Sequence, residues 1–118
     1  MKINKVITHI DFDDSSILVT LEDGTKLSFY HSQDCCEHVY IYDWKGNLHE
    51  LLGKKLLMIE KDDDDFTEEV GFEVHEHYTC SNFKFITDEK TVISRWIGES
   101  NGYYSEDVEL DIIAPRCK

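Results

Sequence analysis

One segment of the chain gathers the side chains with the widest range of chemistry. It contains His31, Gln33, Asp34, Cys35, Cys36, Glu37 and His38. Imidazole nitrogens and thiolates are ligands that zinc prefers in proteins. The candidate metal ligands are therefore His31, Cys35 and Cys36, joined by His75 and His77 from further along the chain. A cysteine beside a histidine also matches the pairing of a nucleophile with a base.

The spacing of these residues argues against both chemistries. Zinc sites usually place two residues between their cysteines so that both thiolates reach one ion, but Cys35 and Cys36 are adjacent. Asp34 and Glu37 flank the thiols, and their negative charge disfavours the thiolate form. We expect no catalytic residue and no cofactor here, with zinc as the alternative. The segment would then be a connection between two strands, and its polar side chains would hold it in place through hydrogen bonds to the backbone.

A second segment, residues 95–105, combines an arginine, aromatic residues and turn residues. This mixture is typical of protein recognition surfaces. Its candidate binding residues are Arg95, Trp96, Glu99, Ser100, Asn101, Tyr103 and Tyr104, and those of the first segment are His31, Gln33, Asp34, Cys35, Cys36 and Glu37. The alternative is a hairpin whose aromatic side chains alternate between core and surface, with Asn101-Gly102 as the turn.

The sequence around both segments predicts a mainly β protein. Residues 17–21 and 26–30 are β-rich runs joined at Asp23-Gly24, a pair that favours a tight hairpin turn. Other strands are expected at residues 6–12, 39–44, 55–59, 72–86, 91–97 and 103–113, with one short helix at 48–52 capped by Asn47. The expected fold is a single small antiparallel β-barrel or sandwich, α+β at most, over residues 1–118. The expected core comprises Ile10, Phe12, Leu18, Leu27, Phe29, Val39, Ile41, Leu51, Leu57, Phe85, Val92, Trp96 and Val108.

The charge of the chain disfavours two classes of partner. The 118 residues carry 25 Asp and Glu against 12 Lys and Arg, a net charge of −13. Phosphate backbones and anionic lipids would be repelled, so we expect no direct nucleic-acid binding and no membrane binding. We expect a protein partner that is basic or itself binds nucleic acid, and the oligomeric state stays open. Residues 60–69 are expected to form an exposed acidic loop, and residues 114–118 a C-terminal tail.

The cellular compartment is predicted from the cysteines and from hydropathy. Four cysteines, two of them adjacent, are a poor basis for the disulfides of a small secreted domain, so reduced thiols are expected. The sequence also has no apolar run of about 18 residues and no apolar stretch near its first residues. These patterns predict a cytosolic protein.

The two segments resemble the signature stretches of a family of small uncharacterised proteins from bacteriophages and bacteria, a domain of unknown function. The family patterns are H-x-Q-D-C-C-E-x-V and R-W-x-G-E-S-N-G-Y-Y-S, and this chain matches both in order and spacing. It departs at Asn47, Cys80 and Asn82 from the family's acidic G-D-L/D-L-I-G and aromatic T-W-T-F-Y-K-F stretches. The resemblance implies a shared fold and a phage or mobile-element setting in the cytoplasm of a bacterial host cell. It implies no activity, ligand or catalytic residue.

Two functional hypotheses follow. The first is a non-enzymatic acidic binding module, a phage or mobile-element accessory protein that engages a host protein. It depends on the acidic composition and on the absence of a coherent catalytic motif in the sequence. The alternative is a zinc-binding protein or a cysteine-dependent enzyme that uses residues 31–38.

Overall fold

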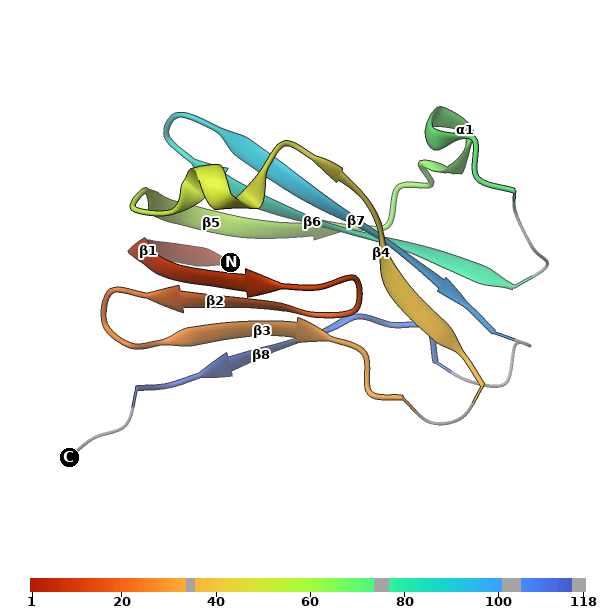
Figure 1. Ribbon diagram of the computed structural model, residues 1–118, viewed down its shortest axis with the longest axis horizontal. Helices are drawn as coiled ribbons and strands as arrows, with labels where there is room; N and C mark the ends of the chain where they lie inside the picture. Colours follow the sequence, from red (N-terminus) through yellow and green to blue (C-terminus); the bar gives the residue numbers. More distant parts are fainter. Residues whose placement is uncertain (34–35, 74–76, 101–104, 116–118) are drawn as a thin grey trace.

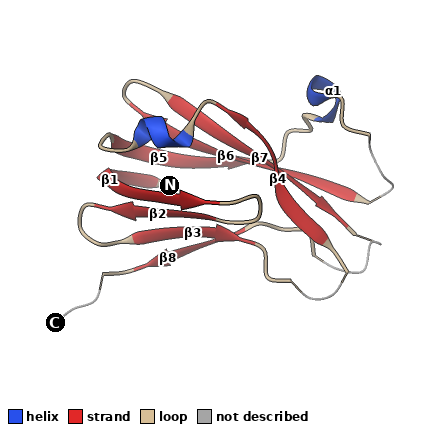
Figure 2. Ribbon diagram, viewed as in Figure 1, coloured by secondary structure: helices blue, strands red, loops and turns tan. Residues whose placement is uncertain are grey.

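The computed structural model describes residues 1–33, 36–73, 77–100 and 105–115 and confirms a mainly β fold. Eight antiparallel strands form one sheet in the order β4-β7-β6-β5-β1-β2-β3-β8 (Figure 1). The strands are β1 (Lys2–Phe12), β2 (Ile17–Leu21), β3 (Lys26–Tyr30), β4 (His38–Lys45), β5 (Lys55–Asp62), β6 (Tyr78–Thr87), β7 (Thr91–Glu99) and β8 (Glu109–Ile113). Two short helices complete the described structure: η1 (Leu48–Leu51) and α1 (Thr67–Val70) (Figure 2).

The sheet folds over so that its two halves share one core. Phe29 of β3 contacts Phe83 and Phe85 of β6, with ring centroids 5.0 and 5.3 Å apart. Since β3 and β6 are not neighbours in the sheet, these contacts join its inner faces. Trp96, Phe29 and Phe85 are the largest fully buried side chains, and nine of the predicted core residues are buried: Leu27, Phe29, Val39, Ile41, Leu51, Phe85, Val92, Trp96 and Val108.

The predicted inner face was wrong for β2 and incomplete for β1. In β2 the buried residues are Ile17, Val19 and Leu21, so Leu18 lies on the outer face. In β1 a register shift between Ile7 and His9 interrupts the alternation. Such a bulge adds one residue and moves the following side chains to the other face. Ile7, which was not predicted, therefore lies on the same face as Ile10 and Phe12, which pack partly buried against the core as predicted. Leu57 of β5, also predicted as a core residue, is only partly buried.

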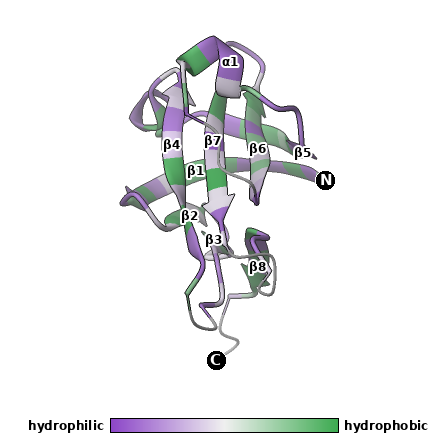
Figure 3. Ribbon diagram, turned by 90° about the vertical axis from the view of Figure 1, so that its right-hand side faces the viewer, coloured by the Kyte–Doolittle hydropathy of each residue, from purple (hydrophilic) through white to green (hydrophobic). Residues whose placement is uncertain are grey.

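The acidic segment is not one continuous loop. Strand β5 extends through Asp62, and α1 begins at Thr67. Phe66 and Thr67 are buried, because Phe66 packs with Cys80 and Ile97 on the outer face of the sheet. Figure 3 shows α1 at the end of the molecule, above the adjacent strands β4, β7 and β6. The segment therefore covers part of this outer face while most of its carboxylates remain exposed.

Other element boundaries also differ from the prediction. The expected helix at 48–52 is the 3-10 helix η1, and the side chain of Asn47 accepts a hydrogen bond from the backbone N–H of His49 as expected (3.0 Å). Strands β6 and β8 begin at Tyr78 and Glu109, later than predicted. Ala114 and Pro115 of the expected tail are exposed, and residues 116–118 lie outside the described residues.

Candidate functional site

The first segment forms a closed network of hydrogen bonds. His31 donates from Nδ1 to the backbone carbonyl of Asp107 (2.6 Å) and from Nε2 to the Glu37 carboxylate (3.0 Å). Gln33 Nε2 donates to the carbonyl and to the carboxylate of Glu37 (2.5 and 3.1 Å). The side chains of His31 and Glu37 are only 5% and 0% exposed. The network therefore joins the β3–β4 connection to the chain leading into β8, and neither side chain faces solvent.

The surroundings of His31 favour its charged form. Burial acts to lower the pKa of its imidazole, but the hydrogen bond to Asp107, the hydrogen bond to Glu37 and the nearby carboxylate charges outweigh burial, so the pKa is raised above 6.5. Both partners of the ring accept hydrogen bonds, and only the doubly protonated imidazole donates to both. His31 and Glu37 therefore form a buried ion pair.

We predict that this ion pair makes stability depend on pH. Because the pKa of His31 is raised in the folded state, its contribution is fully present below about pH 6.5 and is lost as the pH rises through the folded-state pKa. Urea denaturation at several pH values should show this loss in the wild type and not in His31→Gln. An identical pH profile for the two proteins would contradict the assignment.

The other candidates of the first segment are not assembled into a site within the described chain. Asp34, Cys35 and His75 lie outside the described residues, and His77 is exposed. Cys36 is exposed and disulfide-bonded, which corrects the prediction of reduced thiols. Cys80 is a buried free thiol, as predicted. In the described ranges no group of three or more His, Cys, Asp or Glu could hold a metal ion.

Arg95, from the second segment, is buried and ties together three parts of the fold. Its side chain is 6% exposed, and its guanidinium lies 3.6 Å from Asp43 of β4 and 3.3 Å from Glu69 of α1. The same group lies over the ring of Phe66, 5.5 Å from its centroid. Arg95 therefore holds the α1 segment on the sheet and does not point to solvent as a recognition residue.

The rest of the second segment is also mainly structural where it is described. Trp96 is fully buried and donates from Nε1 to Ser94 Oγ (3.2 Å), which confirms the core alternative for this residue. Glu99 and Ser100 are partly buried, and Ser100 N donates to the carbonyl of His77 (3.3 Å). Asn101, Tyr103 and Tyr104 lie outside the described residues.

Gly98 is required by a close backbone approach. A methyl group at this position would lie 2.7 Å from Glu106 Cβ and 2.8 Å from the Glu106 carbonyl oxygen. We predict that Gly98→Ala lowers the free energy of unfolding by about 1–3 kcal/mol, because the backbone at residue 106 must move. Urea denaturation measures this change. Unchanged stability would mean that the chain at residue 106 shifts at no cost.

The outer face of β4, β7, β6 and β5 carries basic residues that form ion pairs with neighbouring carboxylates. The strand register places Asp43, Arg95, Asn82 and Asp62 side by side across these four strands. Lys84 pairs with Asp62 (3.2 Å). A shallow hollow of about 220 Å³ beside this row is lined by Lys45, Asp62, Asp64, Asp65, Phe66, Glu69, Asn82, Lys84, Ile93 and Arg95. Asn82, Asp62 and Lys84 were not predicted as site residues. The available signal was that Asn82 and Lys84 alternate with the buried Phe83 and Phe85 along β6.

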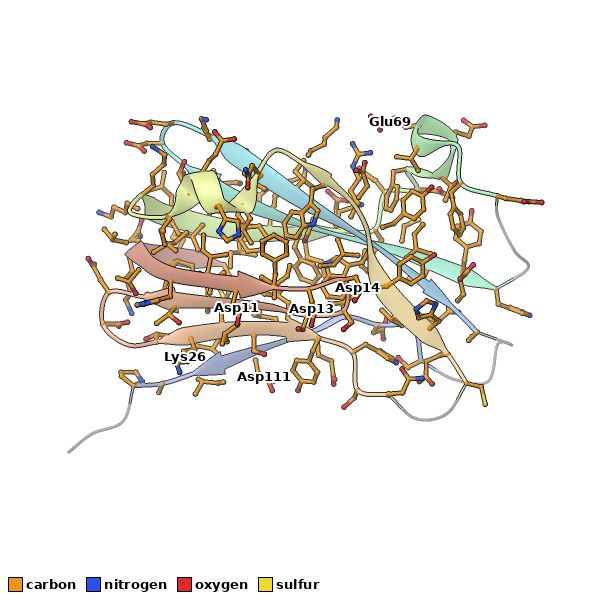
Figure 4. All side chains as sticks on the ribbon, viewed as in Figure 1. Asp11, Asp13, Asp14, Lys26, Glu69 and Asp111 are labelled. Atoms are coloured by element: carbon orange, nitrogen blue, oxygen red, sulfur yellow. The ribbon has the colours of Figure 1, made fainter. Side chains whose placement is uncertain are left out.

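The outer face of β1, β2, β3 and β8 carries a second group of acidic residues. Its exposed carboxylates, which we call the acidic face, are Asp11, Asp13, Asp14, Glu109 and Asp111. None of the five forms an ion pair with another described residue. Figure 4 shows Asp11 and Asp111 on these strands and Asp13 and Asp14 at the turn between β1 and β2, together with Lys26, whereas Glu69 lies at α1.

The register explains how distant carboxylates meet on this face. Asp11 pairs with Leu18, Leu18 with Ser28, and Ser28 with Asp111, which makes one row across four strands. Two shallow hollows of about 320 and 560 Å³ flank this row, and Asp11 and Leu18 line both. Tyr30 Oη donates to the Asp111 carboxylate (2.6 Å), and this bond raises the pKa of Tyr30. The backbone N–H of Ser15 helps to lower the pKa of Asp13, so that carboxylate stays charged.

The fold and the acidic face define a small antiparallel β domain with a charged, shallow surface. Residues 1–110 match the family model described as Domain of unknown function (DUF7448), and the chain belongs to this family. No curated protein and no solved structure matches the chain. In the part of the chain that the structure describes, no helix is long and apolar enough to cross a membrane.

Proposed function

We propose that this protein is a non-enzymatic binding module that engages a basic surface of another protein through its acidic face. The observation that carries this proposal is the difference between the two outer faces. On one, Arg95, Lys45 and Lys84 form ion pairs with nearby carboxylates. On the other, the five carboxylates of the acidic face have no ion-pair partner among the described residues.

The shape of the acidic face supports protein binding. Leu18 lies partly exposed in the middle of it, beside the hollows that Asp11 also lines. An apolar centre with a charged rim is the usual anatomy of a protein interface. Unpaired carboxylates also attract a basic partner over several ångströms and raise its rate of association.

The partner that fits best is a basic protein, and nucleic-acid-binding proteins carry such surfaces. Their phosphate-binding sites carry clustered Lys and Arg, which the acidic face would contact in place of phosphate. The phage or mobile-element setting implied by the sequence resemblance agrees with an accessory protein that engages a host protein. The alternative of a zinc-binding or cysteine-dependent enzyme has less support, because His31 and Glu37 are closed to solvent.

The proposal predicts how charge variants change partner capture. Asp11→Asn with Asp111→Asn should weaken capture of a basic partner from a bacterial lysate several-fold, because two unpaired charges are removed. The matched control, Glu60→Gln with Glu68→Gln, removes the same charge from exposed residues elsewhere. Capture should also fall as the salt concentration rises from about 0.1 to 1 M, where screening shortens from about 10 to 3 Å. Equal loss in both variants, or capture that resists salt, would rule out the acidic face as the binding surface.

A further inference from the structure

Strand β8 ends the sheet and leaves one edge open in the described structure. It pairs with β3 from Tyr30↔Glu109 to Lys26↔Ile113, and no described backbone hydrogen bond runs from β8 to another strand. Ile112 and Ile113 are 56% and 49% exposed. Such an edge is a ready template for an added strand.

The side chains of β8 divide into two sets by their register. Glu109, Asp111 and Ile113 lie opposite Tyr30, Ser28 and Lys26, on the same outer face as the rest of the acidic face. Leu110 and Ile112 lie opposite Phe29 and Leu27, which belong to the core. Leu110 packs against that core, whereas Ile112 remains mostly exposed. The open edge thus presents carboxylates on one side and an uncovered apolar side chain on the other.

We propose that the basic partner docks by adding an extended strand to the open edge of β8. This inference rests on the proposed function, since it names how the partner reaches the acidic face. In the added strand, basic residues at every second position would face Glu109 and Asp111, which are about 6.7 Å apart along the strand. The residues between them would be apolar and would cover Ile112.

Charge complementarity selects a basic strand over a second copy of this chain. Two antiparallel copies of β8 centred on Asp111 would place the two Asp111 carboxylates opposite each other, and like charges in that position are destabilising. The net charge of −13 opposes self-association further. Acidic residues on an edge strand block pairing between copies and leave the edge open to a strand of opposite charge.

The test uses the full chain, labelled with 15N, and three capped heptapeptides as probes. The first alternates lysine and valine. The second has the same composition with its lysines and valines in two blocks, and the third replaces each valine by proline, which keeps the charge but removes amide donors. NMR titration of the labelled chain at low salt gives the affinity for each peptide and identifies the backbone amides whose signals shift.

We expect the alternating peptide to bind at least about tenfold more tightly than either control peptide, with its largest shifts at residues 109–113. Asp111→Asn should weaken this binding, and Glu60→Gln should not. Equal affinities for the three peptides, with shifts centred on Asp11 and Leu18, would overturn strand addition and leave the acidic-face proposal standing. If the affinity changes neither with salt concentration nor in Asp111→Asn, strand addition and the acidic-face proposal are both overturned. A dimer in sedimentation that Ile112→Lys dissociates would show that a second copy occupies the edge.

Discussion

Replacement of His31 by alanine is expected to lower the free energy of unfolding by about 3–5 kcal/mol. The loss is large because the Glu37 carboxylate, 0% exposed, would remain buried without its cationic partner. Gln33 would still donate to Glu37, but a neutral amide does not replace an imidazolium. The same substitution also leaves the Asp107 carbonyl without its hydrogen bond from Nδ1. Urea denaturation followed by tryptophan fluorescence at pH 6 measures the change.

Two further variants distinguish the stability lost with the buried ion pair from a general effect of removing a histidine. His9→Ala removes an exposed imidazole and should change stability by no more than about 0.5 kcal/mol. The double variant His31→Ala with Glu37→Gln should recover part of the loss, because no charge is then left buried. A single-variant loss below about 1 kcal/mol, or no recovery in the double variant, would show that the pair contributes little.

Replacement of Trp96 by alanine is expected to cost about 3–5 kcal/mol. Trp96 is fully buried in β7, between Ile41 of β4 and Ser81 of β6 in the register. Its removal leaves a cavity in the core and takes away the hydrogen bond to Ser94, which is itself buried. Circular dichroism during urea denaturation measures the loss without depending on the tryptophan signal.

The second tryptophan of the chain is the matched control. Trp44 is partly buried and contacts Phe12, with ring centroids 5.0 Å apart. Trp44→Ala should cost clearly less than Trp96→Ala, because neighbouring water can fill the space that it leaves. If the two losses are equal, or that of Trp44→Ala is the larger, Trp96 is not the centre of the core.

Turns and strands could be predicted from the sequence where residues close together in the chain determine their conformation. Asp23-Gly24 joins β2 and β3 as expected, and Gly24 has a positive φ of 89°. The inner face of β2 could not be predicted, because the run from Ile17 to Leu21 has apolar residues at both parities. The face of β1 depends on a bulge near Ile7 that no local pattern indicates. In both strands the tertiary contacts decide which apolar residues are buried.

The candidate sites required long-range information. His31, Gln33 and Glu37 were predicted as one group, but the role of His31 depends on Asp107, 76 residues away. The acidic face likewise exists only because β8 returns to pair with β3 and places Asp111 in the same row as Asp11. The strand order of the sheet creates that row, and one sequence does not contain the strand order.

The late position of β8 in the chain has a consequence for folding. Tyr30 and Asp111, which are hydrogen-bonded in the finished sheet, are 81 residues apart, whereas β1, β2 and β3 are consecutive strands joined by short turns. Closing a long loop carries a larger entropic cost, so the β1–β2–β3 meander should form early and β8 should join late. Until then the backbone N–H and C=O groups along the outer edge of β3 are unpaired and can pair with another chain. Aggregation during refolding should therefore depend on how fast the C-terminal strand docks.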